Sequence, residues 1–176
     1  MRIKESSNII QDLLVFEPTV YRDHRGENVE TFNPEFFDKA LCIVDEIRIN
    51  NLKFTVDSFS FSRKNVLRGF HGDTKAWKLI QCIQGSMYFV VVDLRKDSPT
   101  YKNVQTFTVD DKNRYQVLVP RGCVNAHLCI TDTCIFNYKL TYGYVQQQDQ
   151  ITLKWNDPEY NIFWPIKEPI LSLRDS

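Results

Sequence analysis

Near neutral pH the sequence offers few side chains that titrate, chiefly its three histidines: His24, His71 and His127. His71 follows the run Val66-Leu67-Arg68-Gly69-Phe70, which reads as the end of a strand. Arg68 and Lys78 place two cations near it in the sequence. This pattern makes His71 a candidate general base, and it leaves open that His71 is a structural histidine.

Strand alternation bears on whether Arg68 can act beside His71. In a regular strand Arg68 would face one side, and Gly69 and His71 would face the other, so the pair need not share a face. Gly69 has no side chain and permits another group to approach the backbone closely.

Other chemistries find less support in the sequence. Small metal-binding β-barrels often use a His-x-His pair, but Gly72-Asp73 follows His71, and a site built from all three histidines would require them to converge. No G-x-S-x-G motif of a serine hydrolase is present. The cysteines are odd in number and form no C-x-x-C pair, which predicts buried thiols and neither disulfides nor zinc: Cys42, Cys82, Cys123, Cys129 and Cys134. We expect no metal and no cofactor.

The elements that must position these side chains are mostly strands. Residues 77–83 and 87–94 flank the turn Gln84-Gly85-Ser86 and predict a hairpin. Further strands are predicted at 106–109, 116–119, 134–140 and 149–155. The single clear helix start has Asn33 as its cap and Pro34 as its first residue, ahead of residues 35–41. A chain of 176 residues with this pattern predicts one mainly β domain, a sandwich or a barrel.

Charge and hydropathy narrow the class of partner. Lys+Arg and Asp+Glu both number 22, so the net charge is zero and binding to nucleic acid or to a membrane surface is not supported. A phosphate-bearing ligand would need only a few local Arg or Lys side chains. The start of the chain lacks an apolar signal core, and no run approaches the roughly 20 apolar residues of a membrane helix. We expect a cytoplasmic protein.

Motif blocks occur in order from about residue 12 to residue 175: Asp23-His24-Arg25-Gly26 with Glu30 and Phe32, Val66 to His71 with Lys78-Leu79, Val92 to Thr100, Pro120-Arg121-Gly122, Tyr138-Lys139, Trp155 to Pro158, Trp164-Pro165, and Leu171-Ser172 with Arg174-Asp175. Together they resemble the dTDP-4-dehydrorhamnose 3,5-epimerase family. The resemblance implies a cupin jelly-roll barrel with few short helices, with an N-terminal arm over about 1–50, the barrel over about 51–155 and a tail over about 156–176. It also implies a homodimer that works without metal or cofactor.

The activity implied by the resemblance is inversion of C3, C5 or both in a 4-keto-6-deoxy sugar linked to a nucleotide diphosphate. In the family pattern His71 is the base that removes the carbon-bound proton, and Asp175 orients its imidazole. Lys78 stabilises the enolate, and Tyr138 returns a proton to the opposite face.

The resemblance also assigns residues to substrate binding. Arg68 matches a position near the phosphates, and Arg25 and Glu30 match positions on an arm that reaches the nucleotide of the partner subunit. Tyr144 aligns with a family tyrosine near the sugar or nucleotide. Tyr142 is only two residues away, so either tyrosine could be the one that matches.

Several positions differ from the family pattern. Gly72-Asp73 stands where Tyr-Gln is usual, and the run Gly122 to His127 stands where Gly-Phe-Ala-His-Gly-Phe is common, so Asn125 occupies the place of a second active-site histidine. Ser58 occupies a site where Asn is usual. His71-Gly72-Asp73 with residues 96–101 also resembles the branch of the family that acts on GDP-linked 4-keto heptoses.

Two other functions stay open for the same fold. A cupin 3,4-ketoisomerase of nucleotide sugars would move the carbonyl group, and a non-catalytic module would bind the sugar nucleotide without proton exchange.

Overall fold

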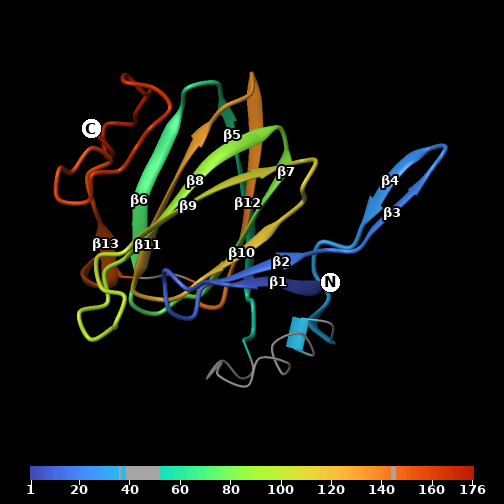
Figure 1. Cartoon of the computed structure of the whole chain (residues 1–176), viewed down its shortest axis with the longest axis horizontal. Helices are drawn as coiled ribbons and strands as arrows, with labels where there is room; N and C mark the ends of the chain where they lie inside the picture. Colours follow the sequence, from blue (N-terminus) through green and yellow to red (C-terminus); the bar gives the residue numbers. More distant parts are fainter. Residues whose placement is uncertain (36, 39–51, 144–145) are drawn as a thin grey trace.

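The computed structural model describes residues 1–35, 37–38, 52–143 and 146–176, and these form two antiparallel sheets that pack as a barrel (Figure 1). The first sheet has the spatial order β1 (Arg2–Ser6), β2 (Leu14–Glu17), β10 (Gln116–Val119), β7 (Lys78–Gln84), β12 (Thr133–Leu140) and β5 (Val56–Arg63). The second has the order β13 (Gln150–Thr152), β6 (Leu67–Asp73), β11 (Cys123–Cys129), β8 (Ser86–Asp93) and β9 (Val104–Asp110). The prediction of a mainly β jelly roll is confirmed.

The predicted hairpin at residues 77–94 is wrong, although both of its strands exist. β7 pairs with β10 and β12 in the first sheet, whereas β8 pairs with β11 and β9 in the second. The chain therefore changes sheets at Gly85, which has a φ of +80°. A Cβ on Gly85 would lie 2.2 Å from the carbonyl oxygen of Thr133. A glycine turn predicts the reversal of the chain but does not decide which strands then pair.

The long apolar run of β8 is explained by cover on both of its faces. Met87, Phe89 and Val91 point into the core between the sheets. Val90 and Val92 point to the other face, where they pack with residues of the C-terminal tail. The core therefore fills part of the space between the sheets, and the site described below occupies another part.

The N-terminal part of the chain carries a hairpin and a helix start. β3 (Val20–Asp23) and β4 (Gly26–Val29) form a hairpin that projects away from the barrel (Figure 1). Asn33 caps the predicted helix, because its side chain accepts a hydrogen bond from the Glu35 amide at 3.1 Å. Residues 34, 35, 37 and 38 are helical. The remainder of the predicted helix and Cys42 lie outside the described residues.

The C-terminal tail packs irregularly against the second sheet. The predicted strand at 149–155 is shorter than expected, since β13 ends at Thr152; a short 3-10 helix, η1 (Gln147–Asp149), precedes it. Trp164 packs against Phe70 and Tyr88, at centroid distances of 6.0 and 5.8 Å. Ile170 then forms a parallel bridge with Val66, next to the start of β6. The tail is thereby returned to the strand that carries His71.

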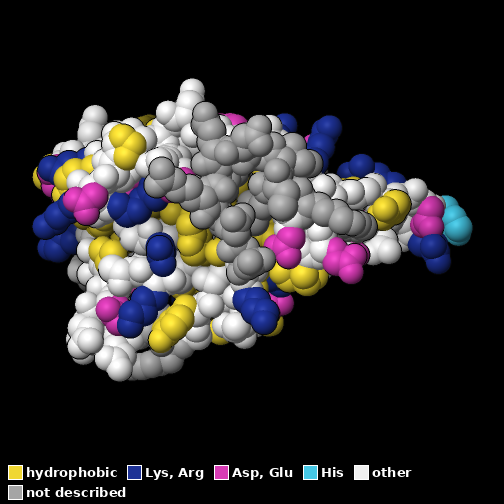
Figure 2. Space-filling view, turned by 90° about the horizontal axis from the view of Figure 1, so that it is seen from below, with side chains coloured by type: hydrophobic (Ala, Val, Ile, Leu, Met, Phe, Trp, Pro, Cys, Tyr) yellow, Lys and Arg dark blue, Asp and Glu magenta, His cyan; other side chains and the backbone are white. Residues whose placement is uncertain are grey.

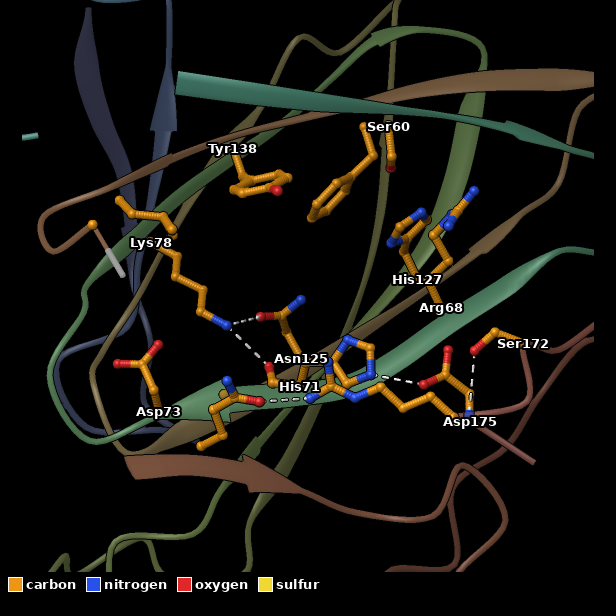
Figure 3. Close-up of a pocket in the computed structure, with 16 residues that line it drawn as sticks. Ser60, Arg68, His71, Asp73, Lys78, Asn125, His127, Tyr138, Ser172 and Asp175 are labelled. Atoms are coloured by element: carbon orange, nitrogen blue, oxygen red, sulfur yellow. Dashed lines mark hydrogen bonds and ion pairs between the residues drawn. The ribbon is translucent and has the colours of Figure 1, made fainter. Parts of the chain in front are cut away.

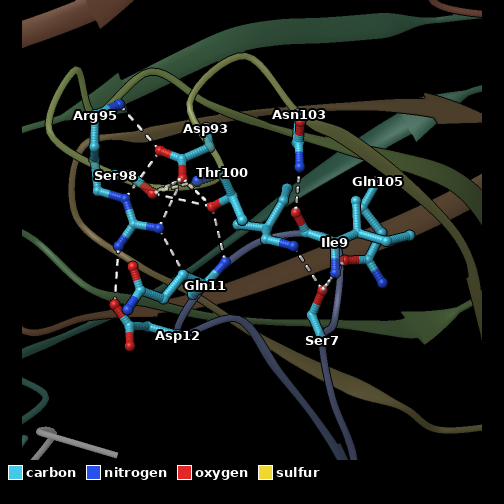
Figure 4. Close-up of polar contacts among 11 residues, drawn as sticks. Ser7, Ile9, Gln11, Asp12, Asp93, Arg95, Ser98, Thr100, Asn103 and Gln105 are labelled. Carbon is cyan, nitrogen blue, oxygen red and sulfur yellow. Dashed lines mark hydrogen bonds and ion pairs between the residues drawn. The ribbon is translucent and has the colours of Figure 1, made fainter.

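A buried carboxylate ties the loop after β8 to the N-terminal segment (Figure 4). Asp93 is fully buried and accepts hydrogen bonds from Arg95, Ser98 and Thr100. Arg95 also contacts Asp12 at 3.0 Å. Burial opposes ionisation of Asp93, but the hydrogen bonds outweigh it and lower its pKa to about 2. The motif block at 92–100 thus has a structural role in this chain.

Candidate active site

A pocket of about 530 Å³ opens between the two sheets, and Figure 3 shows side chains from both of them pointing into it. Its lining comes from the first sheet (Ser60, Lys78, Phe136, Tyr138, Leu140), from the second (Arg68, His71, Gly72, Asp73, Asn125, His127, Gln150), from Gly143, and from the tail (Ser172, Arg174, Asp175).

His71 and Asp175 form the closest ionisable pair in this pocket. The Nε2 atom of His71 lies 2.7 Å from Oδ1 of Asp175, although 104 residues separate them in the sequence. The Asp175 side chain is only 4% exposed, whereas that of His71 is 37% exposed. The amide of Asp175 also contacts Ser172, which fixes the last turn of the tail. The carboxylate therefore sits behind the imidazole, away from solvent.

This arrangement suits the imidazole to act as a base. Burial lowers the pKa of His71 below its ordinary value and outweighs the opposing effect of Asp175. The ring is then neutral at neutral pH. Because Nε2 is engaged by Asp175, Nδ1 is the nitrogen left to accept a proton.

Lys78 links the two sheets at the other end of the pocket. It begins β7, and its Nζ donates hydrogen bonds to the His71 carbonyl at 3.0 Å and to Oδ1 of Asn125 at 3.2 Å. Burial lowers the pKa of Lys78 to about 8, although the charge of Asp73 acts in the opposite direction. The ammonium is thus held in place by two neutral acceptors, and at neutral pH it still carries its charge.

Tyr138 lies on the wall opposite His71 (Figure 3). It belongs to β12 of the first sheet, and its ring packs against Phe136 at a centroid distance of 5.5 Å. His71 belongs to β6 of the second sheet. A flat ligand between the sheets would therefore present one face to His71 and the other to Tyr138.

The regular alternation that would place Arg68 and His71 on opposite faces is not present in β6. His71 pairs with Asn125, and Arg68 pairs with His127. Between these two pairs, β6 therefore contains one residue more than β11. This irregularity brings both side chains into the pocket. Gly69 lies within it with a φ of +122°, and a Cβ there would be 2.6 Å from the carbonyl oxygen of Asn125. The close approach expected at Gly69 is therefore present.

Arg68 is fixed by neutral groups. Its Nε donates to Ser62 Oγ at 2.9 Å, and its Nη2 donates to the Phe61 carbonyl at 3.2 Å. No ion pair to Arg68 is found within the described ranges. Its charge is consequently available to an anion in the pocket.

The two residues after His71, Gly72 and Asp73, differ from the usual family pair, and each has a local structural role. A Cβ on Gly72 would lie 2.3 Å from the carbonyl oxygen of Cys123, so the backbone here leaves no space for a side chain. Asp73 uses one carboxylate oxygen to accept bonds from the amides of Lys75 and Ala76, while it also lines the pocket. Asp73 thus shapes the turn that leads to Lys78.

Three of the expected binding residues that the structure describes do not line this pocket. Arg25 lies in the turn of the hairpin, paired with Asp23 at 2.6 Å, and Glu30 is exposed just after β4. Figure 2 shows charged side chains and a histidine gathered at the end of this projection. Ser58 lies on β5 beside Tyr138, but Ser60, two residues further, is the serine in the pocket. Tyr144 lies outside the described residues.

The sequence reasoning also missed residues that the pocket contains. Ser60 shares a face of β5 with Ser58, and this spacing of two could have indicated it. His127 was considered only as a possible metal ligand. It is buried and stacks on Phe136 at a centroid distance of 4.2 Å. Burial lowers the pKa of His127 to about 3, so its ring is neutral.

The histidines do not converge in the part of the chain that is described. His24 lies in the turn between β3 and β4, whereas His71 and His127 line the pocket.

Among the residues that the structure describes, no helix is long and apolar enough to cross a membrane.

Comparison with known proteins gives consistent matches over nearly the whole chain. The family model described as dTDP-4-dehydrorhamnose 3,5-epimerase matches residues 7–176. The chain is 34% identical to the dTDP-4-dehydrorhamnose 3,5-epimerase of Shigella flexneri, over 94% of this chain and 89% of that one. It is 36% identical to the protein of the same name from Methanothermobacter thermautotrophicus, over 88% and 80%. The crystal structure of the Bacillus anthracis dTDP-4-dehydrorhamnose 3,5-epimerase, with TDP and PPi bound, has a TM-score of 0.87 at 32% identity and covers 99% of this chain and 95% of that one.

Proposed function

This chain belongs to the dTDP-4-dehydrorhamnose 3,5-epimerase family, and on that premise we propose that it inverts C3, C5 or both in a 4-keto-6-deoxy sugar linked to a nucleotide diphosphate. The observation that carries the proposal is the hydrogen bond between His71 and Asp175 in a pocket whose opposite wall holds Tyr138. A base and an acid on opposite walls are what inversion at carbon requires.

The first step is removal of a proton from the carbon beside the ketone. The C4 carbonyl acidifies this hydrogen, and Nδ1 of His71 accepts it as the C–H bond breaks. Asp175 holds the imidazole in the required tautomer and stabilises the imidazolium that forms. The electron pair moves to the carbonyl oxygen and forms an enolate.

The enolate oxygen then needs a positive partner. Lys78 is a half-buried cation in the pocket, and its ammonium is already oriented by two hydrogen bonds. A fixed charge in a site with little water stabilises a developing oxyanion more than a solvated one does. Lys78 therefore lowers the barrier to proton removal.

Reprotonation completes the inversion. The Tyr138 hydroxyl gives its proton to the carbon from the face opposite His71, the carbonyl re-forms, and the phenolate regains a proton from solvent, to which His71 returns its own. The configuration at that carbon is thereby reversed. If both C3 and C5 are inverted, the sequence of steps occurs twice.

The nucleotide part of the substrate is held by charge. Arg68 faces the pocket without an ion-pair partner within the described ranges, and it is the group that we assign to the diphosphate. Arg25 and Glu30 lie away from this pocket, and we assign them to the nucleotide bound by a second copy of the chain in a homodimer. We further propose a GDP-linked 4-keto heptose as the substrate, because His71-Gly72-Asp73 with residues 96–101 resembles the branch of the family that acts on such sugars.

A deuterium-exchange assay tests the proposal. The protein is incubated in deuterated water with 4-keto-6-deoxy sugars linked to dTDP, GDP and CDP, and NMR should find deuterium at C3, C5 or both of at least one of them. Exchange with a displaced carbonyl would instead indicate the ketoisomerase. Binding without exchange would indicate the non-catalytic module.

A further inference from the structure

Among the residues that the structure describes, two buried polar atoms in the pocket have no hydrogen-bond partner. They are Oγ of Ser60 and Nε2 of His127, and both residues line the pocket. Buried polar atoms in folded proteins are nearly always paired, and leaving one unpaired costs free energy. Two such atoms in one pocket point to a ligand group that completes them.

The two residues come from opposite walls of the pocket, and each neighbours Phe136. Ser60 on β5 pairs in register with Phe136 on β12, and the Phe136 ring stacks on His127 of β11 with an interplanar angle of 7°. Figure 3 shows Ser60, His127 and Arg68 at one end of the pocket and Lys78 at the other. The unpaired atoms therefore lie at the end away from the proposed enolate site.

The chemistry of this pair suits a ligand group that can both donate and accept a hydrogen bond. His127 is fully buried and has a pKa of about 3, so its ring is neutral and offers one N–H donor and one acceptor nitrogen. The Ser60 hydroxyl likewise donates one hydrogen bond and accepts others. A hydroxyl group of the ligand can accept from one of them and donate to the other. An apolar group in the same place would leave both atoms unpaired.

We propose that Ser60 and His127 together bind one hydroxyl group of the sugar and so determine which sugar the enzyme accepts. This inference rests on the proposed epimerase function and deepens it. A site built to bond a hydroxyl rejects an analogue that lacks it much more strongly than an apolar pocket rejects an added one. The family run quoted above has Phe at the position of His127. The imidazole of His127 can form a hydrogen bond that this Phe cannot, so we expect the substitution to change which sugar is bound.

The test compares a nucleotide sugar that the wild type converts with analogues that each lack one hydroxyl. His127→Phe keeps an aromatic ring against Phe136, and Ser60→Ala removes only the hydroxyl. Each should lower kcat/KM for the complete substrate by about 10-fold to 100-fold. In the wild type, each analogue should have a lower kcat/KM than the complete substrate. Both variants should remove this difference for one and the same analogue, and the differences for the other analogues should persist. Ser86→Ala, the same change on β8 outside the pocket, should alter neither quantity.

Unchanged selectivity in both variants would overturn the inference, as would a loss that is equal for the complete substrate and for every analogue. Melting temperatures verify that the variants are folded, and Ser60→Ala decides alone if His127→Phe does not fold. A wild type that exchanges no proton refutes the epimerase function separately. Calorimetric Kd values for the same compounds then replace kcat/KM, and the same comparison decides the role of Ser60 and His127.

Discussion

At the residue scale, the proposed mechanism depends on which groups carry a proton at working pH. His71 must be neutral to accept a proton, and its pKa lies below the ordinary value of 6.5 because it is buried. Lys78 must be protonated to stabilise the enolate, and its pKa is about 8. Activity therefore falls as the pH drops through the pKa of His71, and it falls again as the pH rises through that of Lys78.

The pH profile of kcat/KM measures both limits. We expect a bell-shaped curve with an acidic limb below pH 6.5 and an alkaline limb near pH 8. Lys78→Arg should keep some activity and move the alkaline limb upward, because arginine stays protonated throughout. An alkaline limb that stays near pH 8 in this variant would show that Lys78 is not the group that titrates there.

Asp175 is proposed to act through His71, and a variant that lacks the Asp175 carboxylate tests this role. Asp175→Asn keeps the size of the side chain but removes the charge that stabilises the imidazolium. We expect kcat to fall by about 100-fold or more with little change in KM. The acidic limb of the pH profile should also move to lower pH, since the carboxylate raises the pKa of His71. A normal kcat, or an unmoved acidic limb, would assign Asp175 a merely structural role.

The residues of the site were predictable to different degrees. His71 could be selected as a candidate from its type and its neighbours, but spacing alone could not join it to Asp175 across 104 residues. The family resemblance supplied that partner. His127 and Ser60 were not identified as a pair, because a buried atom without a partner is a property of packing and leaves no periodic signal in the sequence.

At the scale of elements, the loop after β8 is held by the Asp93 cluster shown in Figure 4. Asp93→Asn would weaken the ion pair with Arg95 in a fully buried position. We expect the free energy of unfolding to fall by about 3 kcal/mol, as for other broken buried pairs. Urea denaturation checks this. Asp97→Asn, the same change at an exposed position of the same loop, is the control, and an equal loss in the two variants would contradict the structural role of Asp93.

The strands β6 to β10, β12 and β13 could be predicted because their apolar periodicity is local. The strands β1 to β5 and β11 were not predicted, and neither was the way the strands pair. The turn at Gly85 is evident in the sequence, yet β7 and β8 enter different sheets: β7 pairs with β10 and β12, and β8 pairs with β9 and β11. The irregular pairing of β6 with β11 is a similar case. It depends on backbone contact at Gly69, and it changes which side chains reach the pocket.

At the scale of the whole molecule, composition and strand spacing were sufficient to predict a mainly β fold. They were not sufficient to predict how the tail reaches the pocket. The tail delivers Asp175 through the bridge of Ile170 to Val66, and the projecting hairpin keeps Arg25 away from the pocket of its own chain. The homodimer, which the family resemblance implies, is proposed to bring this hairpin to the pocket of a second copy.

Mixed dimers test whether the hairpin serves the other subunit. Arg25→Ala should impair both sites of a homodimer, and His71→Ala should abolish both. Co-expression of the two variants should restore about a quarter of wild-type activity, because half of the dimers are mixed and half of their sites are intact. Activity no higher than that of the Arg25→Ala homodimer would contradict a shared site, as would a monomer in light scattering.

The central claim is that His71 and Tyr138 act on opposite faces of the sugar, and the stereochemistry of deuterium incorporation tests it most directly. In deuterated water the wild type should incorporate deuterium with inversion. His71→Ala should incorporate none, while Tyr138→Phe should incorporate deuterium through His71 with retention of configuration. Inversion that persists in Tyr138→Phe, or exchange that persists in His71→Ala with an unchanged fold, would contradict the account.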